Sequence, residues 1–197
     1  MILYSVIITL SMALIALVNI FFDTPAHELG TGNILLAVLI STAAVIALDG
    51  LVAFLVRRLP ERFFRHGQRC FAVSRAECRL YRILGVRHIA PLIPELGHFT
   101  GFHKNRVAEP RNKEYLERFI LECNYGTVIH LLNAVTGPLI LLIYPAEYAL
   151  CIGIPIALVN AVLSLLPFMV LRYNTPKLES LYRRNLLRLK AHEQTCS

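Results

Sequence analysis

Lysine and arginine are absent from two long stretches of the 197-residue sequence, residues 1–56 and 119–171. All 20 lie in residues 57–118, which hold fourteen, and in residues 172–197, which hold six. The net charge of +7 alone could indicate a nucleic-acid partner, but this complete separation argues against one. Positively charged segments of membrane proteins stay on the cytoplasmic side. The distribution therefore predicts that residues 57–118 and 172–197 are cytoplasmic, and no nucleic-acid partner is expected.

Charged residues are scarce as a whole, at 17% of the chain against 56% hydrophobic residues, and the mean hydropathy is +0.56. Soluble domains are usually less apolar. About 20 apolar residues cross a bilayer as a helix, and four runs are long enough. The first run lacks the basic start of a signal peptide. We expect an all-α, multi-pass cell-membrane protein with cytoplasmic termini, built as a single domain (1–197) with spans at about 2–22, 33–56, 119–143 and 149–171, a cytoplasmic cap (57–118) and a basic tail (172–197).

Two segments outside these spans have the pattern of amphipathic helices that lie in the membrane interface. Arg75, Arg79 and Arg82 fall on one helical face, opposite apolar side chains, and would point towards anionic headgroups. In the tail, Leu178, Leu181, Tyr182 and Leu189 alternate with basic residues in the same way. At the end of the cytoplasmic segment, Asn112 can act as the N-cap residue of a helix that starts at Lys113 and continues into the third span.

Several catalytic motifs are also absent. The sequence contains no G-x-S-x-G, no phosphate-binding glycine loop and no H-E-x-x-H, and it lacks the His-x4-Asp signature of glycerolipid acyltransferases. The five cysteines show no C-x-x-C pairing, so we interpret them as structural or incidental. His98 and His103 have no obvious third ligand, and no metal site is predicted.

Two titratable residues lie where the chain enters the third span, Glu122 and His130. An ionisable group at this depth costs about 2–3 kcal/mol unless it is satisfied, so both are candidates for function. Eight residues of helix rise about 12 Å and rotate roughly 80° past two turns, so the two cannot touch. His130 would then take its partner from elsewhere, with Glu95, Asp49 and Asn160 as alternatives, or would be a histidine that only packs helices together.

A loop rich in proline and glycine, residues 89–103, carries Glu95, His98 and His103. Prolines and glycines prevent a regular helix there. Such a loop can line a site, although exposed loop histidines without a role would have the same pattern.

Four motifs follow one another in the chain: Leu59-Pro-Glu-Arg-Phe-Phe64, Pro94-x-x-Gly97, Glu122 with His130, and Arg172-Tyr-Asn-Thr-Pro-Lys-Leu178. This order resembles the glycosyl-4,4'-diaponeurosporenoate acyltransferase family, small bacterial membrane proteins associated with the last step of staphyloxanthin-type carotenoid synthesis. The similarity covers roughly residues 57–190, and the last motif is its most specific part. In the family, an arginine and a second glutamate usually stand at the positions of Tyr125 and Thr127.

The resemblance implies transfer of a fatty acyl group to a sugar hydroxyl of a membrane-embedded glycosylated isoprenoid or other glycolipid, at the cytoplasmic face. The donor would be acyl-CoA or an acyl-carrier thioester, without a further cofactor, and the partners would be membrane lipids and the acceptor. No oligomeric state is predicted. The implied catalytic residues are His130, Glu122 and His98, and the implied substrate-binding residues are Arg172, Asn174, Glu95, His103, Arg118 and Arg106.

Two other functions stay open at this stage. The changes at Tyr125 and Thr127 favour a non-enzymatic membrane protein that binds a lipid or acts as a scaffold. A transport accessory has less support, because four spans without an internal repeat are not typical of transporters.

Overall fold

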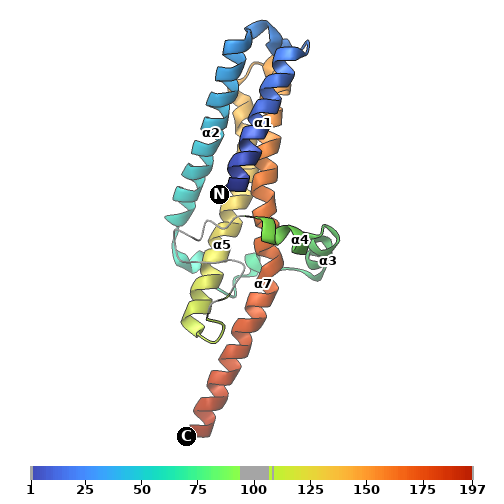
Figure 1. The fold of residues 1–197 in the computed structure, drawn as a ribbon. Helices are drawn as coiled ribbons and strands as arrows, with labels where there is room; N and C mark the ends of the chain where they lie inside the picture. Colours follow the sequence, from blue (N-terminus) through green and yellow to red (C-terminus); the bar gives the residue numbers. More distant parts are fainter. Residues whose placement is uncertain (1, 94–106, 108, 197) are drawn as a thin grey trace. The chain divides into compact units, whose positions relative to one another are not determined.

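The computed structural model describes residues 2–93, 107 and 109–196. Within these residues the chain forms helices and turns without a β-strand (Figure 1). Four helices are long and apolar enough to cross a membrane, Leu3–Phe21, Thr31–Arg57, Lys113–Ile143 and Ala146–Leu189. The predicted all-α class with four candidate spans is therefore confirmed. The chain divides into two compact units, residues 1–56 with 129–166 and residues 57–128 with 167–197, and each is described by itself.

The first unit is a bundle of apolar helices. It contains α1 (Ile2–Phe21), η1 (Pro25–Leu29), α2 (Thr31–Arg57) except its last residue, the second part of α5 (Lys113–Thr136), η6 (Gly137–Ile143), α6 (Ala146–Tyr148), the π-helical turn η7 (Ala149–Gly153) and the first part of α7 (Ile154–Cys196). Its core includes Val38, Val45, Ile152 and Ile156. Large side chains such as Leu10 and Phe21 are exposed on the outside, as expected of helices whose outer surfaces contact lipid.

Asn19 ties α1 to the turn η7 in this unit. Its amide donates to the carbonyl oxygens of Ile15 at 2.8 Å and Cys151 at 3.0 Å, and its side-chain oxygen accepts from Thr24 Oγ1 at 2.9 Å. The residue is completely buried. A buried amide with all these partners is stabilising rather than costly, so it fixes this end of the bundle.

The second unit packs short cap elements against the first part of α5 and the second part of α7. The cap elements are η2 (Glu61–Phe63), η3 (Arg69–Phe71), α3 (Arg75–Ile83), α4 (Val86–Ile89) and η4 (Ala90–Leu92). Leu116, Phe119, Leu171, Leu178 and Tyr182 are buried together in its core. Asn112 Oδ1 accepts the Tyr115 amide hydrogen at 3.1 Å, which confirms the predicted cap of α5.

The predicted arginine-rich helix is α3, which Ser74 caps by accepting the Glu77 amide hydrogen. Its arginines are exposed, and so are Leu80 and Ile83 on its apolar side.

The tail differs from the expectation of a separate interfacial helix. It is helical but continues α7 without a break, through Pro176. Leu178 and Tyr182 are buried in the core of the second unit rather than exposed on an interfacial face. Alternation of apolar and basic residues cannot distinguish these two situations, because a protein core and a membrane surface both favour one apolar face.

Candidate functional site

Three polar side chains from three helices meet inside the first unit. Asn160 on α7 donates through Nδ2 to Asp49 Oδ1 of α2 at 3.4 Å and to the Asn133 carbonyl oxygen of α5 at 3.2 Å. Asn133 and Asn160 are both more than nine-tenths buried. We call Asp49, Asn133 and Asn160 the polar cluster. Polar side chains within candidate spans are expensive unless they bond to one another or serve a function.

The side-chain oxygen of Asn133 distinguishes this cluster from a purely structural one. Oδ1 is buried and has no hydrogen-bond partner among the described residues. An unsatisfied buried acceptor costs about 1–3 kcal/mol. His130 lies one helical turn before Asn133 on α5, in the same unit, and is half-buried. Residues three apart on a helix are neighbours on its surface, so a half-buried imidazole and an unused hydrogen-bond acceptor occur next to each other.

Gly137 allows Asn160 to approach α5 and η6. A Cβ atom at position 137 would lie 2.5 Å from Asn160 Nδ2, well inside contact distance. Small residues at helix contacts in membranes serve this purpose. The segment Asn133–Gly137 therefore positions Asn160 in two ways. The Asn133 carbonyl oxygen accepts its hydrogen bond, and the absence of a side chain at Gly137 leaves room for its amide group.

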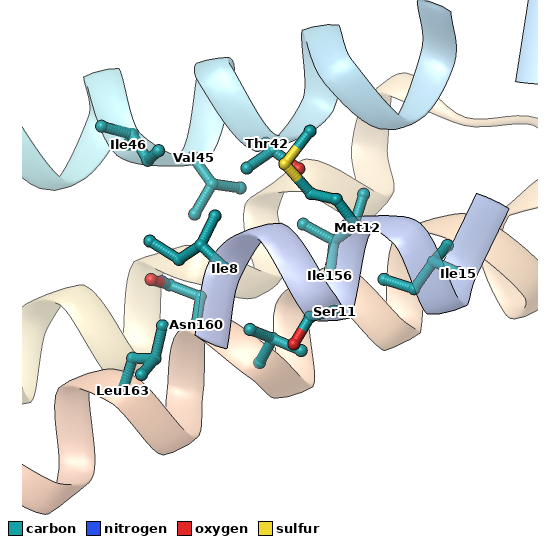
Figure 2. A pocket seen from close by; sticks show the side chains of 11 residues that line it. Ile8, Ser11, Met12, Ile15, Thr42, Val45, Ile46, Ile156, Asn160 and Leu163 are labelled. Carbon is teal, nitrogen blue, oxygen red and sulfur yellow. The ribbon is translucent and has the colours of Figure 1, made fainter. Parts of the chain in front are cut away.

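Asn160 also lines a small pocket of about 40 Å³ among α1, α2 and α7. Figure 2 shows that Ser11 and Thr42 bring hydroxyl oxygens to this pocket and that, apart from these two residues and Asn160, its labelled lining is apolar. The pocket is too small for a whole acyl or isoprenoid chain. It can hold a few apolar atoms beside a polar group.

Glu122 belongs to the second unit, where it lines a groove of about 1190 Å³. Its carboxylate accepts from Arg57 Nη2 at 3.1 Å, an ion pair that is partly exposed and of modest strength. Arg118, exposed on the preceding turn of α5, lines the same groove. So does His66, whose ring centroid is 4.5 Å from that of Tyr182.

The Leu59–Phe64 motif is fastened to α5 by two consecutive residues. Asn124 Nδ2 donates to the Phe64 carbonyl oxygen at 2.8 Å, and the Tyr125 hydroxyl donates to the Leu59 carbonyl oxygen at 2.9 Å. The rings of Tyr125 and Phe64 stack with centroids 3.9 Å apart. Tyr125 therefore holds the Leu59–Phe64 segment, at the start of the predicted cytoplasmic cap, against α5. At the other altered position, Thr127 Oγ1 donates to the Cys123 carbonyl oxygen within α5, which is a local helix contact.

The guanidinium group of Arg172 makes several hydrogen bonds to other residues of the second unit. Nε and Nη2 each donate to a carboxylate oxygen of Glu77 at 2.7 Å. Nη1 and Nη2 also donate to the carbonyl oxygens of Phe71 at 2.9 Å and Ala72 at 3.1 Å. The side chain of Arg172 is 11% exposed. A bidentate ion pair of this kind specifies geometry as well as adding stability. Arg172 therefore holds α3 and the segment before it against α7.

The same contacts shift two pKa values in α3. Burial raises the pKa of Glu77, but the hydrogen bonds from Arg172 and Tyr81 and the charge of Arg172 outweigh burial, so the pKa lies below its ordinary value of 4.5. Burial, followed by the hydrogen bond to Glu77, raises the pKa of Tyr81 to about 12. The Tyr81 hydroxyl donates to Glu77 Oε1 at 2.7 Å. Glu77 is therefore a carboxylate and Tyr81 a phenol at neutral pH.

The residues predicted for one site are thus distributed over the chain. Glu122 and Arg118 share a groove, Arg172 and half-buried Asn174 are on α7, and His130 belongs to the first unit. Glu95, His98, His103 and Arg106 lie outside the described residues. In the described part of the chain, no group of three His, Cys, Asp or Glu residues is arranged to hold a metal ion, and none of its cysteines whose side chains are described forms a disulfide.

Sequence reasoning missed three residues. Asn133 has a signal, since it stands one turn after His130 in an apolar run. Glu77 has none, because its partner is 95 residues away in the chain. His66 follows the Leu59–Phe64 motif by two residues and could have been found there.

Comparison with known proteins gives one finding. A family model described as glycosyl-4,4'-diaponeurosporenoate acyltransferase matches residues 60–184. No curated protein matches the chain, and no solved structure does. The matched range contains Glu122, His130, Asn133, Asn160 and Arg172.

Proposed function

Because the chain belongs to the glycosyl-4,4'-diaponeurosporenoate acyltransferase family, we propose that it moves a fatty acyl group from a cytoplasmic thioester donor to a hydroxyl of a glycosylated isoprenoid or another glycolipid. The family match is the observation that carries this proposal. The four apolar helices support it, since an acceptor of this class is dissolved in the bilayer and its enzyme must reach it there. The distribution of lysine and arginine supports cytoplasmic termini and a site open to the cytoplasm.

His130 is the proposed general base. A hydroxyl is a weak nucleophile until a base accepts its proton, and an imidazole has a suitable affinity for that proton near neutral pH. The acceptor oxygen would attack the thioester carbonyl carbon while a ring nitrogen of His130 takes the hydroxyl proton. The tetrahedral intermediate would then break its carbon–sulfur bond. The departing thiolate would receive the proton from His130, leaving an ester and a free thiol.

The polar cluster supports an acceptor site beside His130. Asn133 Oδ1, buried and without a partner among the described residues, can accept a hydrogen bond from a neighbouring hydroxyl of a sugar. A sugar presents several hydroxyls, so one can react while another is held. Asn160 and Asp49 would keep Asn133 in place through the bond to its backbone.

The remaining predicted residues keep roles in the proposal that do not require contact with the reacting atoms. Glu122 and His98 would position substrates, and Arg118, Arg106, Glu95, His103 and Asn174 would contact them. Arg172 is better described as a positioning residue, because four of its N–H···O contacts are to the protein itself. No cofactor beyond the thioester donor is part of the proposal.

The test compares lipids of a deletion strain complemented with the wild type, His130→Ala or His27→Ala. His27 is an exposed histidine in η1 and serves as the matched control. We expect His130→Ala to lower formation of the acylated product at least about 100-fold, the usual contribution of a general base, and His27→Ala to leave it unchanged. Full product formation by His130→Ala at equal protein level would show that the base assignment is wrong.

A non-enzymatic lipid-binding or scaffold protein is the second candidate. It is favoured by the two altered positions, where Tyr125 and Thr127 make structural contacts instead of presenting charges. The same experiment separates the two functions. Loss of an acylated lipid on deletion supports the enzyme, whereas an unchanged set of acylated lipids supports the scaffold.

A further inference from the structure

A second groove in the unit of residues 57–128 and 167–197 is lined by positive charge. It has a volume of about 520 Å³ and lies between the segment 67–73 and residues 175–187 of α7. Arg69, Arg183 and Arg184 line it, against a single acid, Glu179. All three arginines are exposed, and none of them forms an ion pair with another described residue. We call this the arginine groove.

The arginine groove is rich in hydrogen-bond donors. Each guanidinium offers five N–H groups and no acceptor, and the exposed hydroxyl of Ser180 adds a further donor. Unpaired arginines that converge on one cavity match the oxygen atoms of phosphate, to which guanidinium groups bind with two parallel hydrogen bonds. The ligand that this chemistry favours is therefore an organic phosphate.

The wall of the groove is held in place before any ligand arrives. Arg172 donates to the carbonyl oxygens of Phe71 and Ala72, both of which line the groove, at 2.9 and 3.1 Å. Gly67 begins the same wall with a φ angle of +84°, a conformation that favours glycine. A wall fixed in this way reduces the entropy lost when a ligand binds. It also connects Arg172 with the groove without requiring Arg172 to touch the ligand.

Charge and size indicate which phosphate compound fits. The net positive charge of three arginines and one glutamate is larger than the single negative charge of a phosphodiester, as in a phosphatidylglycerol headgroup, can neutralise. Coenzyme A carries a diphosphate and a further phosphate on its ribose, and the groove volume of about 520 Å³ lies within the range of about 300–1000 Å³ that is usual for small-molecule sites. We propose that the arginine groove binds the phosphate groups of a coenzyme A thioester. The inference rests on the proposed function, because it assigns the donor's binding site.

The test compares two triple variants of the full-length protein in nanodiscs of neutral phosphatidylcholine. One removes the groove charges, Arg69→Gln/Arg183→Gln/Arg184→Gln. The other, Arg79→Gln/Arg87→Gln/Arg188→Gln, removes as much charge from exposed arginines outside the groove lining. Calorimetric titration with coenzyme A is expected to give binding at least about tenfold weaker for the groove variant, and within about twofold of wild type for the control. Thermal unfolding checks that both variants fold.

Several results would overturn the assignment. Absence of coenzyme A binding to the wild type would do so, and so would equal weakening in both variants, which indicates general attraction to positive charge. If the groove substitutions weaken association with phosphatidylglycerol vesicles but not with coenzyme A, the groove binds a lipid headgroup instead.

A further comparison separates this inference from the proposed function. His130→Ala should bind coenzyme A as the wild type does while losing transfer. In the transfer assay the groove variant should raise the KM for acyl-CoA about tenfold or more and keep kcat. If the wild type binds coenzyme A in the groove but transfers no acyl group, the binding site is supported and the proposed acyltransferase function is wrong. If the groove variant transfers acyl groups with an unchanged KM, the function is supported and the binding site is wrong.

Discussion

At the scale of single residues, the contacts of Arg172 and Glu77 are the most specific feature of the structure. A carboxylate that receives two charged hydrogen bonds at 2.7 Å and a third from a phenol is stabilised in its ionised form. Breaking such a pair from one side typically costs about 3–5 kcal/mol when it is buried, because a charge is left without its partner. Glu77 is partly exposed, at 22% of its side-chain area, so its contribution is smaller.

Acidification should destabilise the protein through Glu77. Its pKa is lower in the folded state than the ordinary 4.5, so its contribution to stability is complete above pH 4.5 and decreases as the pH falls towards the folded-state pKa. We expect the melting temperature of the wild type to drop more steeply below pH 4.5 than that of Glu77→Gln, which cannot titrate. Thermal unfolding in detergent between pH 7 and 3 measures this difference, with Glu114→Gln, an exposed glutamate on α5, as the control. Parallel curves for the wild type and Glu77→Gln would contradict the assignment.

The roles of some residues could be predicted from the sequence and those of others could not, for a physical reason. Asn112 was identified as a cap because capping depends on residues within one turn. The arrangement around Arg172 could not be foreseen, because Glu77, Phe71 and Ala72 are about 100 positions away and no local pattern records such a contact. For the same reason the sequence offered Asp49 and Asn160 only as alternative partners of His130. It did not indicate that Asp49, Asn133 and Asn160 are joined to one another.

At the scale of elements, helix type was predictable and helix continuity was not. Apolar runs of about 20 residues determine where spans occur, and the four candidate helices follow them. The end of α7 was not determined in this way, because Pro167 and Pro176 lie inside a helix that continues to Cys196. Proline removes one backbone hydrogen bond. Packing of Leu178 and Tyr182 in the second unit supplies the stability that keeps the helix continuous.

Gly137→Ala should destabilise the contact of α7 with the α5–η6 junction. The added Cβ would lie 2.5 Å from Asn160 Nδ2, and overpacking of this kind costs roughly 1–3 kcal/mol. Gly50→Ala is the matched control, because Gly50 is within α2 and its Cβ would meet nothing within 4 Å. There the helix propensity of alanine predicts unchanged or slightly higher stability. Thermal unfolding measures both variants.

A double variant identifies the cause of the Gly137→Ala effect. Replacing Asn160 by alanine removes the atom that the new methyl group would strike. The cost of Gly137→Ala should therefore be clearly smaller in an Asn160→Ala background. If the two substitutions are simply additive, the strain lies elsewhere and the close approach of Asn160 does not explain the glycine.

At the scale of the whole molecule, the proposed topology depends on charge distribution alone. The structure gives four candidate spans but no orientation, and the positive-inside rule supplies the rest. Cys70 is exposed in the predicted cytoplasmic cap. His27 is exposed in η1, between the first two predicted spans, and cytoplasmic termini would place this segment outside. These two positions allow a direct measurement.

Labelling with a membrane-impermeant maleimide should distinguish the two sides. In a variant that keeps only Cys70, we expect labelling after the cells are permeabilised and not before. In a variant whose only cysteine comes from His27→Cys, intact cells should be labelled. The reverse pattern would invert the topology and place the arginine-rich cap outside.

The order of synthesis gives the continuous helix α7 a further consequence. Each compact unit joins an earlier part of the chain to a later part that includes a portion of α7, residues 129–166 in the first unit and residues 167–197 in the second. A ribosome that has made α1, α2 and α5 has therefore not yet made the last partner of either unit. Residues 57–118, Glu77 among them, are therefore synthesised before Arg172, the partner of Glu77. Quality control of nascent chains should therefore act on this protein late, and a stop codon before position 172 should yield a chain that is degraded rather than half a working protein.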